Sequence, residues 1–212
     1  MITYSPSIFW FRYAVTVTGL SFLIGAGCTH SEMSVDPKAS SSTNSGGISP
    51  QRLADAVHAV VMADRTVYAT HVVSNLQEQN APVMPSEYWD SEDHKVPLPA
   101  QMFRMGAELV NKNPDIGFTY GLKSKWPLNR QNRPGTDVEE KGLEYVAEHV
   151  GENFYADEVI EGKKYLVAVY PDKAVTQACW DCHNTHAERG DDYPVFKEGD
   201  VMGGVIVRVV VP

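Results

Sequence analysis

The feature that most constrains this 212-residue chain is a five-residue motif late in the sequence, Cys179-Trp180-Asp181-Cys182-His183. Two thiols at this spacing can add to the two vinyl groups on one edge of a haem, and the residue that follows then lies beneath the ring. His183 can bind the iron there through an imidazole nitrogen. We therefore predict one covalently attached haem c, with Cys179, Cys182 and His183 as the cofactor-binding residues and His183 as the proximal iron ligand.

Three other kinds of site use the same cysteine spacing. A thioredoxin-type redox pair opens a helix after a strand in a βαβ unit, and the predicted order of elements contains no such unit. A zinc site needs more ligands, but there is no second cysteine pair, so His183 or His186 would have to combine with a distant residue. A disulfide between Cys179 and Cys182 would close a strained loop that adds little stability. Haem attachment is the interpretation that these comparisons favour.

The beginning of the sequence resembles an export signal. Residues 8–27 are apolar apart from Arg12 and end in small residues just before Cys28. The apolar run after Arg12 is shorter than the about 20 residues that span a membrane. Residues 23–28 resemble a bacterial lipoprotein box, in which the cysteine is acylated and becomes the new N-terminus. We predict a signal peptide over residues 1–27 and lipidation of Cys28; an ordinary cleaved signal and an uncleaved anchor are the alternatives.

The segment after this signal predicts a tethered domain. Residues 28–49 are rich in Ser, Thr and Gly, so they cannot bury enough surface to order themselves and form a flexible linker to a domain at residues 50–212. The predicted location is the periplasmic side of a bacterial membrane, the outer membrane in preference to the inner one. A net charge of -9 argues against nucleic acid, which would be repelled. Expected partners are periplasmic or membrane redox or signalling proteins, and the membrane itself through the lipid anchor.

The hydrophobic pattern of the domain predicts both helices and strands. Pro50 suits the first position of a helix, and apolar residues then recur at helical spacing as far as Leu76. Shorter helices are predicted over residues 99–111 and from Thr136, which forms a capping box with Glu139. Strands are predicted over residues 116–122, 153–160, 163–170 and 201–211. Consecutive strands with short turns imply an antiparallel sheet with helices packed on one face, which is an α+β domain.

The second axial position of the iron has several candidates. His71 shares the apolar face of the long helix, so we predict that it points toward the interior, and we take it as the tentative distal ligand. An open position is the main alternative, and the other candidate ligands are Met102, Met105 and Met202. Arg65 precedes His71 by a turn and a half and could assist a peroxidase, but we favour a surface arginine and predict no enzymatic activity.

An ordered set of short motifs runs through the rest of the sequence. It comprises Ser124, Pro127-Leu128-Asn129, Asn132-Arg133-Pro134, Glu139 or Glu140 before a helix, and the segments 165–171, 179–184 and 199–205. This set resembles the periplasmic c-type haem PAS-like sensor domain family, formerly a domain of unknown function. The resemblance covers most of residues 50–212. It implies a PAS-like antiparallel β-sheet with a long N-terminal helix and further helices packed around a c-type haem.

These features predict an exported c-type haem-binding protein that acts as a redox or gas sensor module. The alternative is a lipid-anchored monohaem electron-transfer cytochrome. Some members of the resembled family have a cysteine on the first helix at the distal side, whereas this chain has none after Cys28 except the two in the motif. Six-coordinate low-spin iron with the potential of a donor would favour electron transfer. Five-coordinate iron that takes up carbon monoxide or nitric oxide would favour sensing.

Overall fold

A long helix begins the part of the chain that the computed structural model describes, residues 47–212. Helix α1 spans Pro50–Val67, and the hydroxyl of Ser49 caps it by accepting a hydrogen bond from the backbone. The helical path continues through a π-helical segment, η1 (Tyr68–Ser74), into α2 (Asn75–Glu78). The predicted long helix is confirmed, and the π-helical segment within it was not predicted.

A four-stranded antiparallel sheet, in the order β3-β6-β5-β4, forms the centre of the domain. Its strands are β3 (Phe118–Lys123), β4 (Phe154–Ile160), β5 (Lys163–Lys173) and β6 (Val201–Val210). Glu161 and Gly162 join β4 to β5 with positive φ angles of 49° and 78°, the conformation that two-residue hairpin turns need. Strand β6 lies in the interior of the sheet and pairs with both β3 and β5. The predicted antiparallel sheet is confirmed.

The remaining elements surround this sheet. They are the parallel pair β1 (Met84–Ser86) and β2 (Lys95–Pro97), the helices α3 (Pro99–Asn111), α4 (Asp137–Glu148) and α5 (Gln177–Thr185), and the 3-10 helices η2 (Pro114–Ile116) and η3 (Arg130–Asn132). Thr136 caps α4 as predicted, accepting from the Glu139 N–H at 3.3 Å. The predicted capping box is only half formed, because the Glu139 carboxylate accepts from the Gly135 N–H and not from Thr136.

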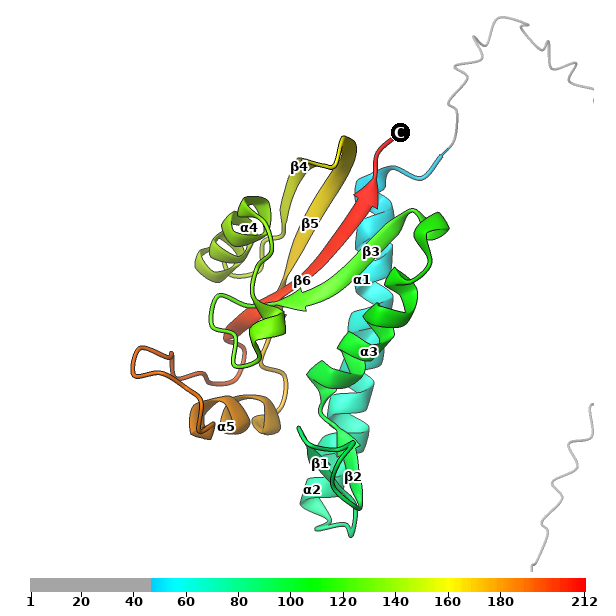
Figure 1. Ribbon diagram of the computed structural model, residues 1–212. Coiled ribbons are helices and arrows are strands. Elements are labelled where there is room, and N and C mark those ends of the chain that lie inside the picture. Colours follow the sequence, from blue (N-terminus) through cyan, green and yellow to red (C-terminus); the bar gives the residue numbers. More distant parts are fainter. Residues whose placement is uncertain (1–46) are drawn as a thin grey trace, which may run out of the picture. The chain divides into compact units, whose positions relative to one another are not determined.

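Helices cover both faces of the sheet, not one face as the sequence predicted (Figure 1). Ala54 of α1 shares a core cluster with Tyr170, whereas Leu143 of α4 packs on the opposite face with Val169. The reason lies in the strands, since every residue over 201–207 of β6 is buried. A strand with apolar side chains on both faces of the sheet needs helices or other elements packed on each face.

The predictions for the beginning of the sequence lie outside the described residues. These are the signal peptide, the lipidation of Cys28 and most of the linker. From residue 47 onward, no helix has both the length and the apolar character that a membrane crossing requires.

Candidate functional site

The Cys-x-x-Cys-His motif lies on α5, a nine-residue helix in the connection from β5 to β6. Positions three and four residues apart share one face of a helix, so α5 presents Cys179, Cys182 and His183 together. Helix α5 contacts the π-helical segment η1, so the motif lies beside the long N-terminal helix. The structure thus brings the three predicted haem-binding residues to one surface.

The His183 ring is held in a fixed orientation by its neighbours. Its Nδ1 atom lies 2.7 Å from the hydroxyl of Tyr193, and its ring meets Phe196 edge to face, with the centroids 6.1 Å apart. Burial lowers the pKa of His183 to about 4, so the ring is neutral at pH 7, the form that binds metals. No residue in the described range makes a hydrogen bond to Nε2, which leaves this nitrogen for a ligand.

The two thiols are separate and differ in their surroundings. Neither Cys179 nor Cys182 is in a disulfide, and the Cys179 sulfur lies 3.4 Å from the Thr176 hydroxyl. Burial raises the pKa of Cys182, and the negative charge of Glu87 adds to the rise, so this group is a thiol at neutral pH. Within residues 47–212, no group of three or more His, Cys, Asp or Glu side chains could hold a metal ion directly. The zinc alternative therefore lacks a ligand set in this part of the chain.

A buried ion pair links the long helix to β5, the strand that precedes the motif. Arg65 of α1 pairs with Asp172 of β5, and their side chains are only 12% and 8% exposed. Burial alone would lower the pKa of Arg65, but the Asp172 carboxylate raises it above its usual value, and Cys179 contributes to the rise. Asp172 raises and Arg65 lowers the pKa of His183, so both charges act on the motif. The predicted surface position of Arg65 is wrong, because a carboxylate 107 positions away compensates its charge.

His71, the predicted distal ligand, lies on η1 with an exposed side chain. The prediction that it points into the apolar interior is wrong. Val60 and Val67, which helical spacing places on the same face as His71, are themselves 62% and 56% exposed, so this face already points to solvent along α1. Ala69 and Val73 occupy the buried positions of this segment instead. His71 nevertheless belongs to the element that contacts α5.

Two residues of the site were not predicted from the sequence. Asp172 is buried and follows a run of apolar residues in β5. A carboxylate at the end of such a run is a signal in the sequence that could have indicated a buried charge. Tyr193 lies ten residues after His183 in an irregular loop, where no periodicity points to it. Among the methionines considered, Met202 is the one that packs beside the motif, in a cluster with Phe196 and Cys179.

Comparison with known proteins places the chain in a family. The model of the Tll0287-like family, described as Tll0287, matches residues 49–210. Among solved structures, the chain is similar to the cyanobacterial heme-protein Tll0287, with 16% sequence identity, 78% of this chain and 97% of that chain covered, and a TM-score of 0.47. A search of curated proteins found no match. Because the family model spans well over half of its residues, the chain belongs to the Tll0287-like family.

Proposed function

We propose that this protein is an exported c-type haem protein that acts as a redox or gas sensor module. Cys179 and Cys182 carry one haem c through thioether bonds, and His183 binds the iron through Nε2. One observation carries the proposal: a neutral histidine, with Nδ1 already engaged by Tyr193, shares a helix face with two separate thiols. Family membership supports haem binding, since Tll0287, the protein after which the family is named, is described as a heme-protein.

The residues of the chain have distinct roles in this proposal. A bound haem would supply a one-electron iron couple and would bind a gas or a further ligand at its iron. With Nε2 on the metal, Nδ1 must carry the proton and donate a hydrogen bond to the Tyr193 oxygen. This hydrogen bond fixes the ring and raises the basicity of the imidazole. The two cysteines keep the group on a short surface helix. A PAS-like sheet packed against the haem, a lipid anchor at Cys28 and a periplasmic location are parts of the same proposal.

The buried ion pair favours sensing over simple electron transfer. Arg65 lies on α1 and Asp172 on β5, and both charges act on His183. A change of charge at the motif therefore acts in return on the contact between the long helix and the sheet, because electrostatic coupling between groups is reciprocal. Through this coupling a change at the motif alters α1, and a periplasmic or membrane signalling protein recognises that change. A lipid-anchored monohaem electron-transfer cytochrome, docking redox proteins of the same compartment, is the second candidate.

An absorption spectrum of the full-length protein tests the proposal. The chain is produced in a host that matures c-type cytochromes, and spectra are taken before and after dithionite and then carbon monoxide. A pyridine haemochrome of the c type and a spectral change with carbon monoxide are expected. A reduced protein that is six-coordinate and indifferent to carbon monoxide supports the electron-transfer candidate instead. A colourless protein with the mass of the polypeptide alone contradicts haem binding.

The role of His71 is tested by a single substitution. With His71 on η1 proposed as the distal ligand, we expect low-spin ferric iron in the parent protein and a partly high-spin spectrum in His71→Ala, which lacks that imidazole. His149→Ala, which changes another exposed histidine at the C-cap of α4, serves as the control and should leave the spectrum unchanged. Identical spectra for His71→Ala and the parent protein would remove His71 from the site.

The hydrogen bond from His183 to Tyr193 should set part of the reduction potential. In Tyr193→Phe the imidazole loses its acceptor, becomes less basic and stabilises ferric iron less, so the potential should rise. A hydrogen bond of about 1 kcal/mol corresponds to a shift of roughly 40 mV for a one-electron couple. The measurement is a potentiometric titration followed at the visible bands. Tyr145→Phe, which removes a tyrosine hydrogen bond to Glu152 on the exposed side of α4, should leave the potential unchanged.

A further inference from the structure

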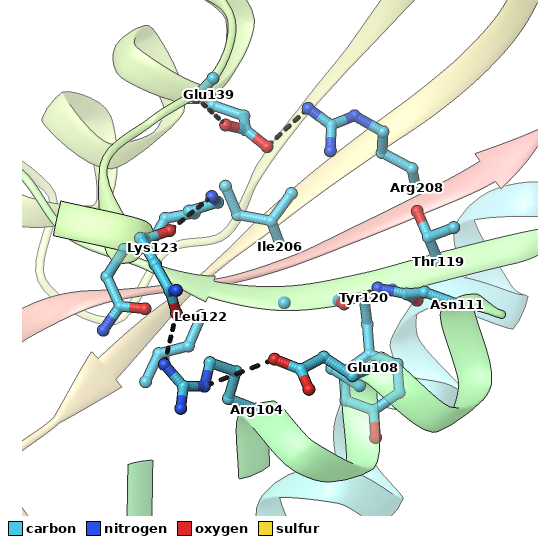
Figure 2. Close-up of a pocket in the computed structure, with 15 residues that line it drawn as sticks. Arg104, Glu108, Asn111, Thr119, Tyr120, Leu122, Lys123, Glu139, Ile206 and Arg208 are labelled. Carbon is cyan, nitrogen blue, oxygen red and sulfur yellow. Dashed lines mark hydrogen bonds and ion pairs between the residues drawn. The ribbon is translucent and has the colours of Figure 1, made fainter. Parts of the chain in front are cut away.

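A pocket with a volume of about 520 Å³ lies on the face of the sheet that α4 covers (Figure 2). Its floor is formed by Thr119, Gly121 and Lys123 of β3 and by Ile206 and Arg208 of β6. Its walls are α3, the segment between β3 and α4, and the first turn of α4. No residue of α5 contributes to it, so this pocket is distinct from the haem motif and does not depend on the function proposed above.

The strand at the floor leaves room for a ligand. Residues of β3 alternate between the two faces of the sheet, so Thr119, Gly121 and Lys123 face the pocket while Tyr120 and Leu122 belong to the core beneath α1. A Cβ atom added at Gly121 would meet nothing within 4 Å, and the glycine is not in the left-handed region. The backbone therefore does not require glycine here. A glycine within a strand is typical of places where another molecule approaches the backbone closely.

Both carboxylates of the lining are already paired with arginines. Glu139 is 2% exposed and accepts from Arg208 at 2.5 Å and from the Gly135 N–H. Glu108 lies 3.5 Å from Nε of Arg104 (Figure 2). Arg208 also pairs with Glu158, whose Oε2 lies 3.4 Å from its Nε, so each arginine of the lining already faces at least one carboxylate.

The fifth charged group of the pocket lining is the ammonium group of Lys123. Its Nζ atom donates to the backbone oxygen of Gln131 at 3.0 Å, and no carboxylate among residues 47–212 lies within ion-pair distance of it. Lys123 is therefore the charged residue of the lining without a carboxylate partner among the described residues. An ammonium without a carboxylate partner in a concave site favours a ligand that brings one carboxylate to it.

We propose that this pocket binds a small organic carboxylate. Its carboxylate group pairs with the Lys123 ammonium, its short body lies over Gly121 and against Ile206, and the hydroxyl of Thr119 adds a polar contact at the floor. The volume falls in the range of about 300–1,000 Å³ that is usual for small-molecule sites. A phosphate group is a poorer match, since it is best held by bidentate arginines, and both arginines here are already engaged with carboxylates.

Calorimetric titration of the purified full-length protein tests the proposal. Acetate, butyrate and benzoate are the carboxylate probes, and butyramide and inorganic phosphate are the comparison probes. At least one carboxylate should bind, and butyramide and phosphate should not. Lys123→Gln should weaken carboxylate binding by about tenfold or more, because it removes a charge-assisted contact. Gly121→Val should abolish binding by filling the floor.

Control variants separate binding from folding. Lys163→Gln removes an exposed ammonium at the start of β5, outside the pocket, and should bind as the parent does. Thermal unfolding shows whether each variant folds; if Gly121→Val does not fold, Lys123→Gln and its conservative partner Lys123→Arg decide the question. Absence of binding by all three carboxylates, binding of phosphate alone, or unchanged carboxylate affinity in Lys123→Gln would overturn the proposal.

Discussion

Replacing Cys179 and Cys182 together with serine is expected to abolish covalent haem attachment completely. A serine hydroxyl does not form the thioether that a thiol forms with a vinyl group, and the described residues contain no other cysteine. The two side chains differ by one atom, and both cysteines are only partly buried, so the helix itself should persist. The measurement is haem staining after denaturing electrophoresis, together with the intact mass of the protein.

The single variants and a distant cysteine give the controls for this experiment. Cys179→Ser and Cys182→Ser should each retain one thioether bond and a haem-stained band. Cys28→Ser removes the cysteine in the predicted lipoprotein box and should leave haem attachment intact while it prevents acylation. Retention of covalently bound haem in the double variant would show that the group is attached elsewhere.

Breaking the buried ion pair should have the largest effect on stability. Arg65→Met leaves the Asp172 carboxylate buried without its partner, and removal of one member of a buried pair typically lowers the free energy of unfolding by about 3–5 kcal/mol. The double variant Arg65→Met with Asp172→Leu leaves no isolated charge and should recover most of that loss. Urea unfolding of the purified protein, followed by far-ultraviolet circular dichroism, measures both changes.

An exposed ion pair provides the matched comparison. Lys164 and Asp157 lie 2.9 Å apart with side chains 53% and 59% exposed, so Lys164→Met should change the free energy of unfolding by less than about 1 kcal/mol. If Arg65→Met lowers the free energy of unfolding no more than Lys164→Met does, the buried pair does not stabilise the fold.

Local sequence signals predicted the elements of this fold well. The strands of the β4–β5 hairpin, the helix at residues 99–111 and the cap at Thr136 each depend on a few neighbouring residues, so they could be identified without tertiary information. The two-sided covering of the sheet was missed, although the uninterrupted apolar run in β6 already indicated it. The α+β class and the family are established, whereas the PAS-like arrangement around a haem stays a proposal.

The surroundings of the motif could not be predicted in the same way. Cys179, Cys182 and His183 were found because their spacing is local, but the partners of the site come from distant positions. Asp172 meets Arg65 only because β5 and α1 pack together. The orientation of His71 was wrong because the apolar pattern was read onto the face of Val60 and Val67, whose side chains are exposed in the folded chain.

The position of β6 bears on how such a protein would be matured. This strand pairs with β3 and β5 on its two edges, yet it follows α5 in the chain. A chain that emerges N-terminus first therefore presents both thiols of the motif before the strand that completes the core. Until β6 inserts, the segment around the motif has no finished sheet to pack on, so assembly enzymes that act on unfolded substrates have access to it. If the motif carries a covalent haem as proposed, its attachment can therefore precede closure of the sheet.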